Sequence, residues 1–268
     1  MVKNVAIVTG GSSGIGAEFA SQLASRGYNL LLVSNQAEAL EQTRLQILSD
    51  RPTLQCLTLF KDLSQPDSAR EIVEYSHSHS LEVEVLVNNA GIFTFKLMEE
   101  LTEAQLNLYI DLHMRTVTHL SLLIASDMKR RGHGYILNMS SMSCWMPMPG
   151  IGMYAATKAY IRIFSRSLHL EMKDYGVKVM AACPGGIATD LFGLPEHLQR
   201  LGVRLGALAT TESFVKGALK RLLRGDKQYV NGIINKLSVV AVSLTPTWAR
   251  LIIKHRMLDR HEDGHSKK

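Results

Sequence analysis

The chain has 268 residues, of which 46% are hydrophobic and 20% charged, and these values fit a globular protein with a full core. Its formal net charge is +6, but lysine and arginine are spread along the chain, which argues against a nucleic-acid partner. The three cysteines form no paired motif, so we expect reduced thiols, no metal site and a cytoplasmic protein. No apolar run is long enough to span a membrane, and the N-terminus lacks the pattern of a signal peptide.

Short apolar runs alternate with helical patterns over most of the chain. The runs predict strands at 4–10, 29–34, 54–60, 83–91, 134–141 and 177–186. The patterns between them predict helices over 14–26, 37–48, 66–78, 103–130, 152–174 and near 212–224, before a short segment at 228–232. Because the strands are apolar on both faces, they are typical of a parallel sheet between two helix layers. We therefore predict an α/β fold, a doubly wound parallel sheet in one domain of residues 1–268, with ligands beyond the carboxyl ends of the strands.

A glycine-rich turn, TGGSSGIG at residues 9–16, follows the first predicted strand. Gly10, Gly14 and Gly16 allow a tight turn whose backbone N–H groups can face a pyrophosphate at the positive end of the next helix. A lone glycine motif is a weak signal, but its place in the first strand–turn–helix unit favours dinucleotide binding.

Five motifs stand in a characteristic order: TGGSSGIG at 9–16, NNAG at 88–91, a serine after the fifth strand, YAATK at 154–158 and PGGIATD at 184–190. With this spacing the chain resembles the short-chain dehydrogenase/reductase family. The resemblance implies a Rossmann-type domain, a nicotinamide cofactor and hydride transfer between an alcohol and a carbonyl. A second hypothesis, of another class, is a non-catalytic sensor or scaffold that binds a dinucleotide with the same fold.

The resemblance also implies which residues hold the cofactor. Those expected to contact it are Gly10, Ser12, Ser13, Gly14, Ile15 and Gly16 at the pyrophosphate, Asp62 and Leu63 at the adenine, Asn89, Ala90 and Gly91 along the ribose, and Pro184, Gly185, Ile187 and Thr189 at the nicotinamide. Asp62 also fits an ordinary acidic residue near the start of a helix, so both roles stay open for it. Asn88 belongs to the same segment, which in the family also supports the sheet.

The choice between NAD and NADP usually depends on the residues at the end of the second strand. An acidic residue there holds the ribose hydroxyl of NAD, whereas a basic residue accepts the phosphate of NADP. This chain has Ser34, Asn35 and Gln36, which are neither acidic nor basic. Because no carboxylate opposes the phosphate, we expect NADP as the preferred cofactor and NAD as the alternative.

The YAATK motif places Tyr154 and Lys158 four residues apart, so both side chains share one face of a helix. A nearby ammonium group lowers the pKa of a tyrosine from its usual value of about 10. We therefore predict that Lys158 tunes Tyr154 as a general acid/base, and the resemblance gives Lys158 a contact with the cofactor ribose. On spacing alone, a surface pair without consequence is the alternative.

The resemblance implies two further catalytic positions. Ser141 matches the serine that holds the substrate oxygen, and its neighbour Ser140 is the competing candidate, since successive strand residues point to opposite faces. His113 stands where the family has an asparagine that supports a water in a proton relay. A neutral histidine can hold such a water, can titrate, or can simply pack in the core.

The segment between Ser141 and Tyr154 is rich in methionine and carries the predicted substrate contacts Met142, Trp145 and Met148. Leu191 and Phe192 are expected to help form a lid within residues 190–225. These residues favour a hydrophobic substrate, such as a steroid or bile-acid ketone or a fatty acyl chain. Core packing or subunit contact is the alternative role of the methionines.

The region 233–268 extends beyond a minimal version of the fold and resembles the tail of broad-specificity bacterial reductases. Its apolar residues lie beside Lys254, His255 and Arg256. We expect this extension to cover the pocket or to contact a partner subunit in a homodimer or homotetramer, and contact with a membrane surface is the alternative.

Overall fold

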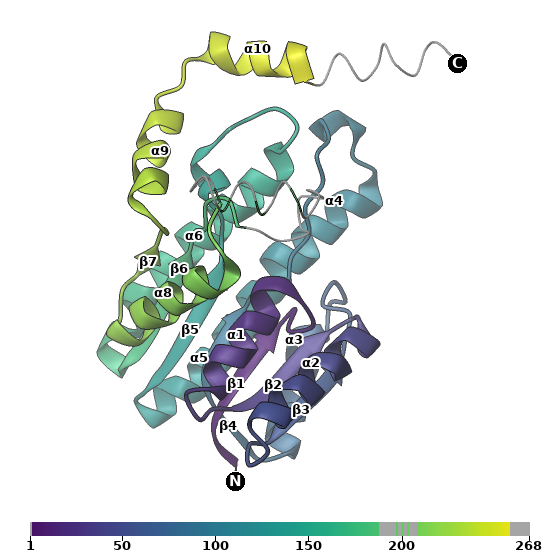
Figure 1. Cartoon of the computed structure of the whole chain (residues 1–268), viewed down its shortest axis with the longest axis vertical. Helices are drawn as coiled ribbons and strands as arrows, with labels where there is room; N and C mark the ends of the chain where they lie inside the picture. The colour runs from purple at the N-terminus through teal and green to yellow at the C-terminus, as the bar shows by residue number, and fades with distance from the viewer. Residues whose placement is uncertain (1, 188–196, 198–199, 201–202, 204–207, 258–268) are drawn as a thin grey trace.

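The computed structural model describes residues 2–187, 197, 200, 203 and 208–257 of the chain. Seven parallel strands form one sheet in the order β3-β2-β1-β4-β5-β6-β7 (Figure 1). The strands are β1 (Val2–Thr9), β2 (Asn29–Ser34), β3 (Cys56–Phe60), β4 (Leu81–Asn88), β5 (Gly134–Met139), β6 (Val177–Ala182) and β7 (Gln228–Tyr229). The predicted doubly wound parallel sheet is confirmed, and the short segment at 228–232 supplies its last strand.

Helices cover both faces of the sheet. One layer consists of α1 (Gly14–Ala24), α2 (Ala37–Asp50) and α8 (Thr211–Arg224), and the other of α3 (Ser68–Ser78), α5 (Thr116–Arg131) and α6 (Gly152–Met172). Among the described residues, the other helices are α4 (Glu103–Tyr109), α9 (Ile233–Ser243) and α10 (Thr247–Met257), with short 3-10 turns at Met98–Glu100, Met142–Trp145 and Lys173–Tyr175.

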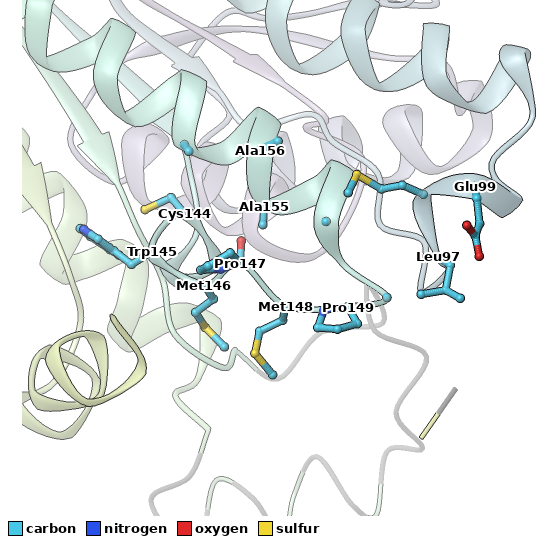
Figure 2. A pocket seen from close by; sticks show the side chains of 15 residues that line it. Leu97, Glu99, Cys144, Trp145, Met146, Pro147, Met148, Pro149, Ala155 and Ala156 are labelled. Carbon is cyan, nitrogen blue, oxygen red and sulfur yellow. The ribbon is translucent and has the colours of Figure 1, made fainter. Parts of the chain in front are cut away.

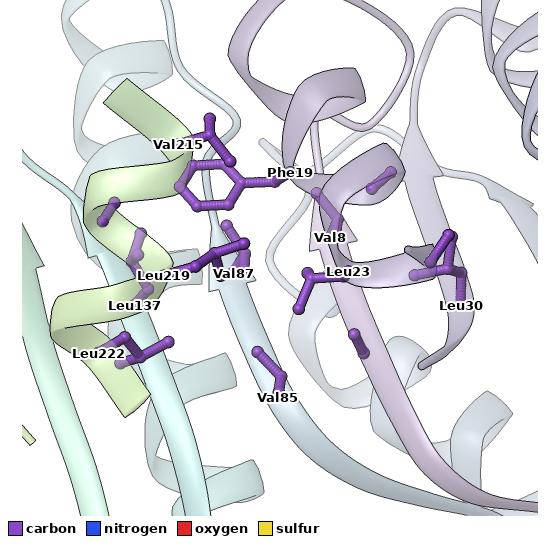
Figure 3. Packing of buried hydrophobic residues seen from close by; sticks show 14 of the residues in the cluster. Val8, Phe19, Leu23, Leu30, Val85, Val87, Leu137, Val215, Leu219 and Leu222 are labelled. Carbon is purple, nitrogen blue, oxygen red and sulfur yellow. The ribbon is translucent and has the colours of Figure 1, made fainter. Parts of the chain in front are cut away.

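Each strand supplies side chains to both cores, as its apolar sequence predicts. In β1, Ala6 and Val8 face the layer of α1 and α8, whereas Val5 and Ile7 face the opposite layer. Figure 3 shows Phe19 and Leu23 of α1 packed with side chains of α8 over the strands. Burying a large apolar side chain of this kind stabilises the fold by about 1.5–3 kcal/mol.

Helix α8 changes the interpretation of the expected lid region 190–225. Its residues Phe214, Val215 and Leu219 are fully buried, and Phe214 meets Phe19 edge to face with ring centroids 6.5 Å apart. Residues 211–224 therefore belong to the body of the fold and do not form part of a lid.

The predicted single helix over 103–130 is divided into three parts. Between α4 and α5, residues Ile110–Arg115 form a π-helical segment, which contains His113. A π-helical turn accommodates an extra residue at a local energetic cost, and such turns are frequent at functional sites. Its position here turns His113 inward, toward the helix that carries Tyr154.

The strand order places the functional site. Strands β1 and β4 are neighbours, with β2 and β3 on one side and β5, β6 and β7 on the other. The direction of chain winding reverses at this point, and ligands of such sheets bind in the crevice beyond the carboxyl ends of these strands.

Candidate active site

The glycine turn lies at the carboxyl end of β1 and leads directly into α1. Gly10 and Gly14 have φ values of +65° and +52°, which favour glycine. At Gly16 a Cβ atom would lie 1.9 Å from the carbonyl oxygen of Gly10, so helix and turn approach as closely as only glycine allows. The N-terminus of α1 therefore opens onto the crevice without a side chain in the way.

The turn is fixed to the end of β4 by two polar side chains. The Asn89 carboxamide donates to the carbonyl oxygens of Thr9 and Gly10 at 3.1 and 3.3 Å. The Thr9 hydroxyl accepts from the backbone N–H groups of Asn89 and Ala90 at 3.0 and 3.1 Å. Thr9 is a positioning residue that the sequence analysis did not identify. Asn88 points away from the crevice and donates to Asn138 at 2.8 Å inside the sheet.

A crevice of about 470 Å³ runs from the glycine turn to the YAATK motif. Most of the predicted cofactor residues line it: Gly10, Ser12, Ser13, Gly14, Ile15, Ser34, Asn35, Asp62, Leu63, Asn89, Ala90, Gly91, Pro184, Gly185 and Ile187. Ser141, Tyr154 and Lys158 lie at its other end. An elongated crevice with a glycine-rich helix N-terminus at one end and an acid/base pair at the other fits a dinucleotide. The predicted Thr189 lies outside the described residues.

The two candidate serines point in different directions. The Ser141 hydroxyl is hydrogen-bonded with the Tyr154 hydroxyl and accepts from the backbone N–H of Ser143 at 3.1 Å. The Ser140 hydroxyl instead donates to the carbonyl oxygen of Lys158 at 2.7 Å and anchors α6. Ser141 is thus the serine that shares the reacting position with the phenol.

The phenol of Tyr154 is held in its protonated form. Burial raises the pKa of Tyr154 to about 12, and the hydrogen bond with Ser141 opposes this rise only in part. Lys158 was expected to lower that pKa, but its ammonium group lies 5.5 Å from the centroid of the Tyr154 ring and donates to the carbonyl oxygen of Met139 at 3.0 Å. Burial also lowers the pKa of Lys158 to about 8. The expected lowering is corrected: burial dominates the pKa of Tyr154, and Lys158 is not among the groups that lower it. The protonated phenol remains suited to the predicted role of proton donor.

Comparison with known proteins decides the family. A family model for short chain dehydrogenases matches residues 4–196. The chain belongs to the short-chain dehydrogenase/reductase family. It is 31% identical to the very-long-chain 3-oxoacyl-CoA reductase of Mus musculus over 91% of this chain and 76% of that protein. It is 30% identical to the 3-oxoacyl-[acyl-carrier-protein] reductase of Escherichia coli (strain K12) over 85% of this chain and 96% of that protein.

Solved structures of this family share the fold. A short-chain dehydrogenase from Sphingobium yanoikuyae in complex with NADPH superposes with a TM-score of 0.77 at 24% identity, over 94% of this chain and 96% of that one. Family membership and the convergence of Ser141, Tyr154 and Lys158 make this protein a nicotinamide-dependent oxidoreductase. The alternative of a sensor or scaffold has no support in this arrangement.

His113, which replaces the family's asparagine, has both ring nitrogens engaged. Nε2 accepts from the backbone N–H of Ile92 at 3.0 Å, so the ring proton resides on Nδ1. Nδ1 lies 2.9 Å from the Thr157 hydroxyl, which itself donates to the carbonyl oxygen of Tyr154 at 2.9 Å. Burial first, and then the charge of Lys158, lower the pKa of His113 well below its usual value.

This arrangement defines what His113 does in the short-chain dehydrogenase/reductase site. Its ring is fully buried and meets the Tyr154 ring edge-on, with centroids 6.0 Å apart. With both nitrogens used, it has no lone pair for a relay water. His113 is a neutral positioning residue that ties the segment after β4 to helix α6.

Asp62 lines the crevice while it stabilises its own turn. Its carboxylate accepts from the backbone N–H and the hydroxyl of Ser64 at 2.9 and 2.7 Å. These bonds hold the pKa of Asp62 below its usual value. The carboxylate is therefore ionised and rigid at the adenine end of the crevice.

A second, apolar cavity of about 690 Å³ adjoins the catalytic residues (Figure 2). Trp145 and Met148, both predicted substrate contacts, line it together with Leu97, Met98, Met146, Pro147 and Pro149. Met142, also predicted as a substrate contact, does not line this cavity. Its backbone N–H donates to the Pro184 carbonyl oxygen at 2.8 Å. The predicted lid residues Leu191 and Phe192 lie outside the described part of the chain.

Proposed function

We propose that this protein is an NADPH-dependent reductase of a ketone attached to a long apolar chain, with 3-oxoacyl thioesters as the substrate class. The observation that carries the proposal is the apolar cavity beside the catalytic residues. Ser143 lines this cavity and donates to Ser141, and Ala155 lines it one residue after Tyr154. An apolar chain in the cavity would thus extend from a carbonyl held at Ser141 and Tyr154. The two relatives reported above are named as reductases of 3-oxoacyl groups.

The chemistry follows from the donors at this position. A carbonyl oxygen between Ser141 and Tyr154 accepts hydrogen bonds from both hydroxyls, which polarises the carbonyl carbon. A nicotinamide cofactor, when held in the crevice between the glycine turn and Ile187, would supply the hydride for that carbon. The oxygen takes the proton of Tyr154, and the ketone becomes a secondary alcohol. The phenolate that remains then regains a proton, which returns Tyr154 to its protonated form.

The preference for NADPH is supported by a cation that the sequence analysis did not consider. Lys61 lines the adenine end of the crevice together with Ser34, Asn35 and Gln36. Strands β2 and β3 pair Ser34 with Phe60, so Lys61 stands beside Asn35, at the position that selects the cofactor. Its ammonium group is paired with Glu71 at the rim. A 2′-phosphate beside Asn35 would find this ammonium as a charge-assisted donor.

The cofactor preference is tested by calorimetric titration of the purified protein with NADP⁺ and NAD⁺. Lys61→Gln is expected to weaken NADP⁺ binding about tenfold, the effect of one hydrogen bond to a charged group, and to leave NAD⁺ binding unchanged. Lys61→Arg, which keeps the charge, should retain the preference. Equal weakening for both cofactors would refute the assignment.

The substrate class is tested with NADPH and three sets of ketones: short 3-oxoacyl thioesters, long 3-oxoacyl thioesters and steroid ketones. We expect kcat/KM to increase with acyl length, because each added methylene buries more apolar surface. Tyr154→Phe should lower kcat by about 10²- to 10⁴-fold while NADP⁺ still binds. Turnover of steroids alone would replace the acyl proposal, and binding of NADPH without any turnover would revive the scaffold hypothesis.

A further inference from the structure

The last two helices form an arm that leaves the body of the molecule. Helix α9 starts beside the nicotinamide end of the crevice, where a Cβ on Gly185 would meet the Asn235 side chain at 2.4 Å. From there α9 and α10 extend away from the sheet, and α10 lies across the far end of α9 (Figure 1). Seven large apolar side chains of this region are exposed by 44% to 76%: Ile233, Ile234, Leu237, Leu244, Trp248, Leu251 and Ile252.

These side chains form stripes with helical spacing. In α9, Ile233 and Leu237 are separated by four residues and share one face, and the exposed Leu244 follows in the turn after the helix. In α10, Trp248 is followed at three and four residues by Leu251 and Ile252. A stripe of aliphatic and indole side chains in water is unfavourable, so it requires a partner.

The charge of the segment points to the kind of partner. Between Asp226 and Asp259 the sequence has no acidic residue, but it has five basic ones: Lys227, Lys236, Arg250, Lys254 and Arg256. Four of these basic residues, all except Lys227, lie within the span of α9 and α10, which thus carries a formal charge of +4. A basic helix with an exposed apolar face containing Trp and Leu is typical of helices that lie in the interface of an anionic membrane.

The same charge argues against a second copy of the chain as the partner. The whole chain has a net charge of +6, so two copies repel each other overall, whereas an anionic surface attracts the basic arm. Each helix has 11 residues, whereas a membrane span needs about 20. Among the residues that the structure describes, no helix is long and apolar enough to cross a bilayer.

We propose that α9 and α10 lie on the surface of an anionic lipid bilayer, with their apolar stripes in the headgroup region. The arm begins at the mouth of the active site, so contact with a bilayer would bring the crevice close to the acyl chains of the lipids. This proposal does not depend on the proposed substrate, because binding to vesicles is measured without turnover.

The test is flotation of the full chain with phosphatidylcholine vesicles, with and without phosphatidylglycerol, at low and high salt. The full chain should float with the anionic vesicles at low salt, and high salt should weaken the binding. Leu237→Ser and Trp248→Ser should each reduce vesicle binding about tenfold. Leu45→Ser, on α2 with 55% of Leu45 exposed, is the matched apolar control and should leave binding unchanged.

Charge is tested separately. Lys236→Glu should reduce binding to anionic vesicles about tenfold or more, whereas Lys216→Glu on α8 should have little effect. Failure of the full chain to float with anionic vesicles would overturn the proposal. Equal losses of vesicle binding in the arm variants and in their controls would also overturn it. Sedimentation velocity without lipid tests whether the arm is instead a subunit interface. If the protein is an oligomer that Leu237→Ser dissociates, and if this variant binds vesicles as well as the wild type does, the arm is a subunit interface and the proposal is overturned.

Discussion

His113 provides the sharpest test of the site's internal geometry, because it bonds to the chain on both sides. Replacing it by leucine removes the acceptor of the Ile92 N–H and the partner of the Thr157 hydroxyl, at 3.0 and 2.9 Å. The Ile92 N–H is then left without its acceptor, which costs about 1–3 kcal/mol. The Thr157 hydroxyl keeps its bond to the Tyr154 carbonyl oxygen and loses only its bond with His113, which costs about 0.5–1.5 kcal/mol. At neutral pH we expect His113→Leu to lower the free energy of unfolding by about 1.5–4.5 kcal/mol.

The pH dependence of this loss follows from the lowered pKa. The pKa of folded His113 lies well below 6.5, so on acidification the unfolded chain takes up the proton first. The stability supplied by the neutral ring is therefore complete above about pH 6.5 and falls by about 1.4 kcal/mol per pH unit below it. The leucine variant lacks this dependence, so the difference between wild type and variant should shrink by that amount on acidification.

Urea unfolding at about pH 7.5 and about pH 5.5 measures both quantities. His133→Leu, at an exposed position, is the control and should show neither the large loss nor the change with pH. If the difference between wild type and His113→Leu stayed the same at both pH values, folded His113 would take up its proton at the same pH as the unfolded chain, and the lowered pKa of the buried ring would be refuted.

Two further predictions concern the crevice and the thiols. Gly16→Ala places a Cβ against the Gly10 carbonyl oxygen, so the turn must shift. The affinity for NADP⁺, measured by calorimetry, should then fall about tenfold or more. An unchanged affinity would show that the turn does not shape the site. Among the cysteines, Cys144 is half-buried and its pKa is lowered, first by a hydrogen bond with Cys183, whereas burial raises the pKa of Cys56 to about 12. Iodoacetamide should therefore label Cys144 first, and peptide mass spectrometry that found Cys56 or Cys183 labelled first would contradict the described burial.

Much of the fold could be predicted because its sequence signals are local. The strand β2, with the sequence NLLLVS, is buried along almost its whole length, and such a run identifies a central parallel strand without tertiary information. The π-helical segment at Ile110–Arg115 could not be predicted in this way. Its stability depends on His113 reaching Ile92 and Thr157, and these partners are distant in the sequence. A hydrophobic periodicity of 3.6 residues predicts that the segment is helical, but it does not predict contacts with residues so far away in the sequence.

The position of the Lys158 ammonium group is a second feature that could not be predicted from the sequence. Spacing of four residues predicts that Tyr154 and Lys158 share a helix face, and they do so in the crevice. It does not determine where the flexible lysine stem directs its ammonium, which here is bound to the Met139 carbonyl oxygen. The pKa of the Tyr154 phenol therefore depends on its burial, which cannot be predicted from the spacing of the two residues.

Lys61 illustrates the opposite case, a residue that the sequence could have identified. Once β2 and β3 are accepted as neighbouring parallel strands that end at the same edge, the residue after β3 must stand beside the residue after β2. Cofactor selection then depends on two strand ends and not on one, and a basic residue after β3 can replace the basic residue absent after β2. The proposed preference for NADPH rests on this register, so the Lys61→Gln titration tests the pairing argument as well as the cofactor.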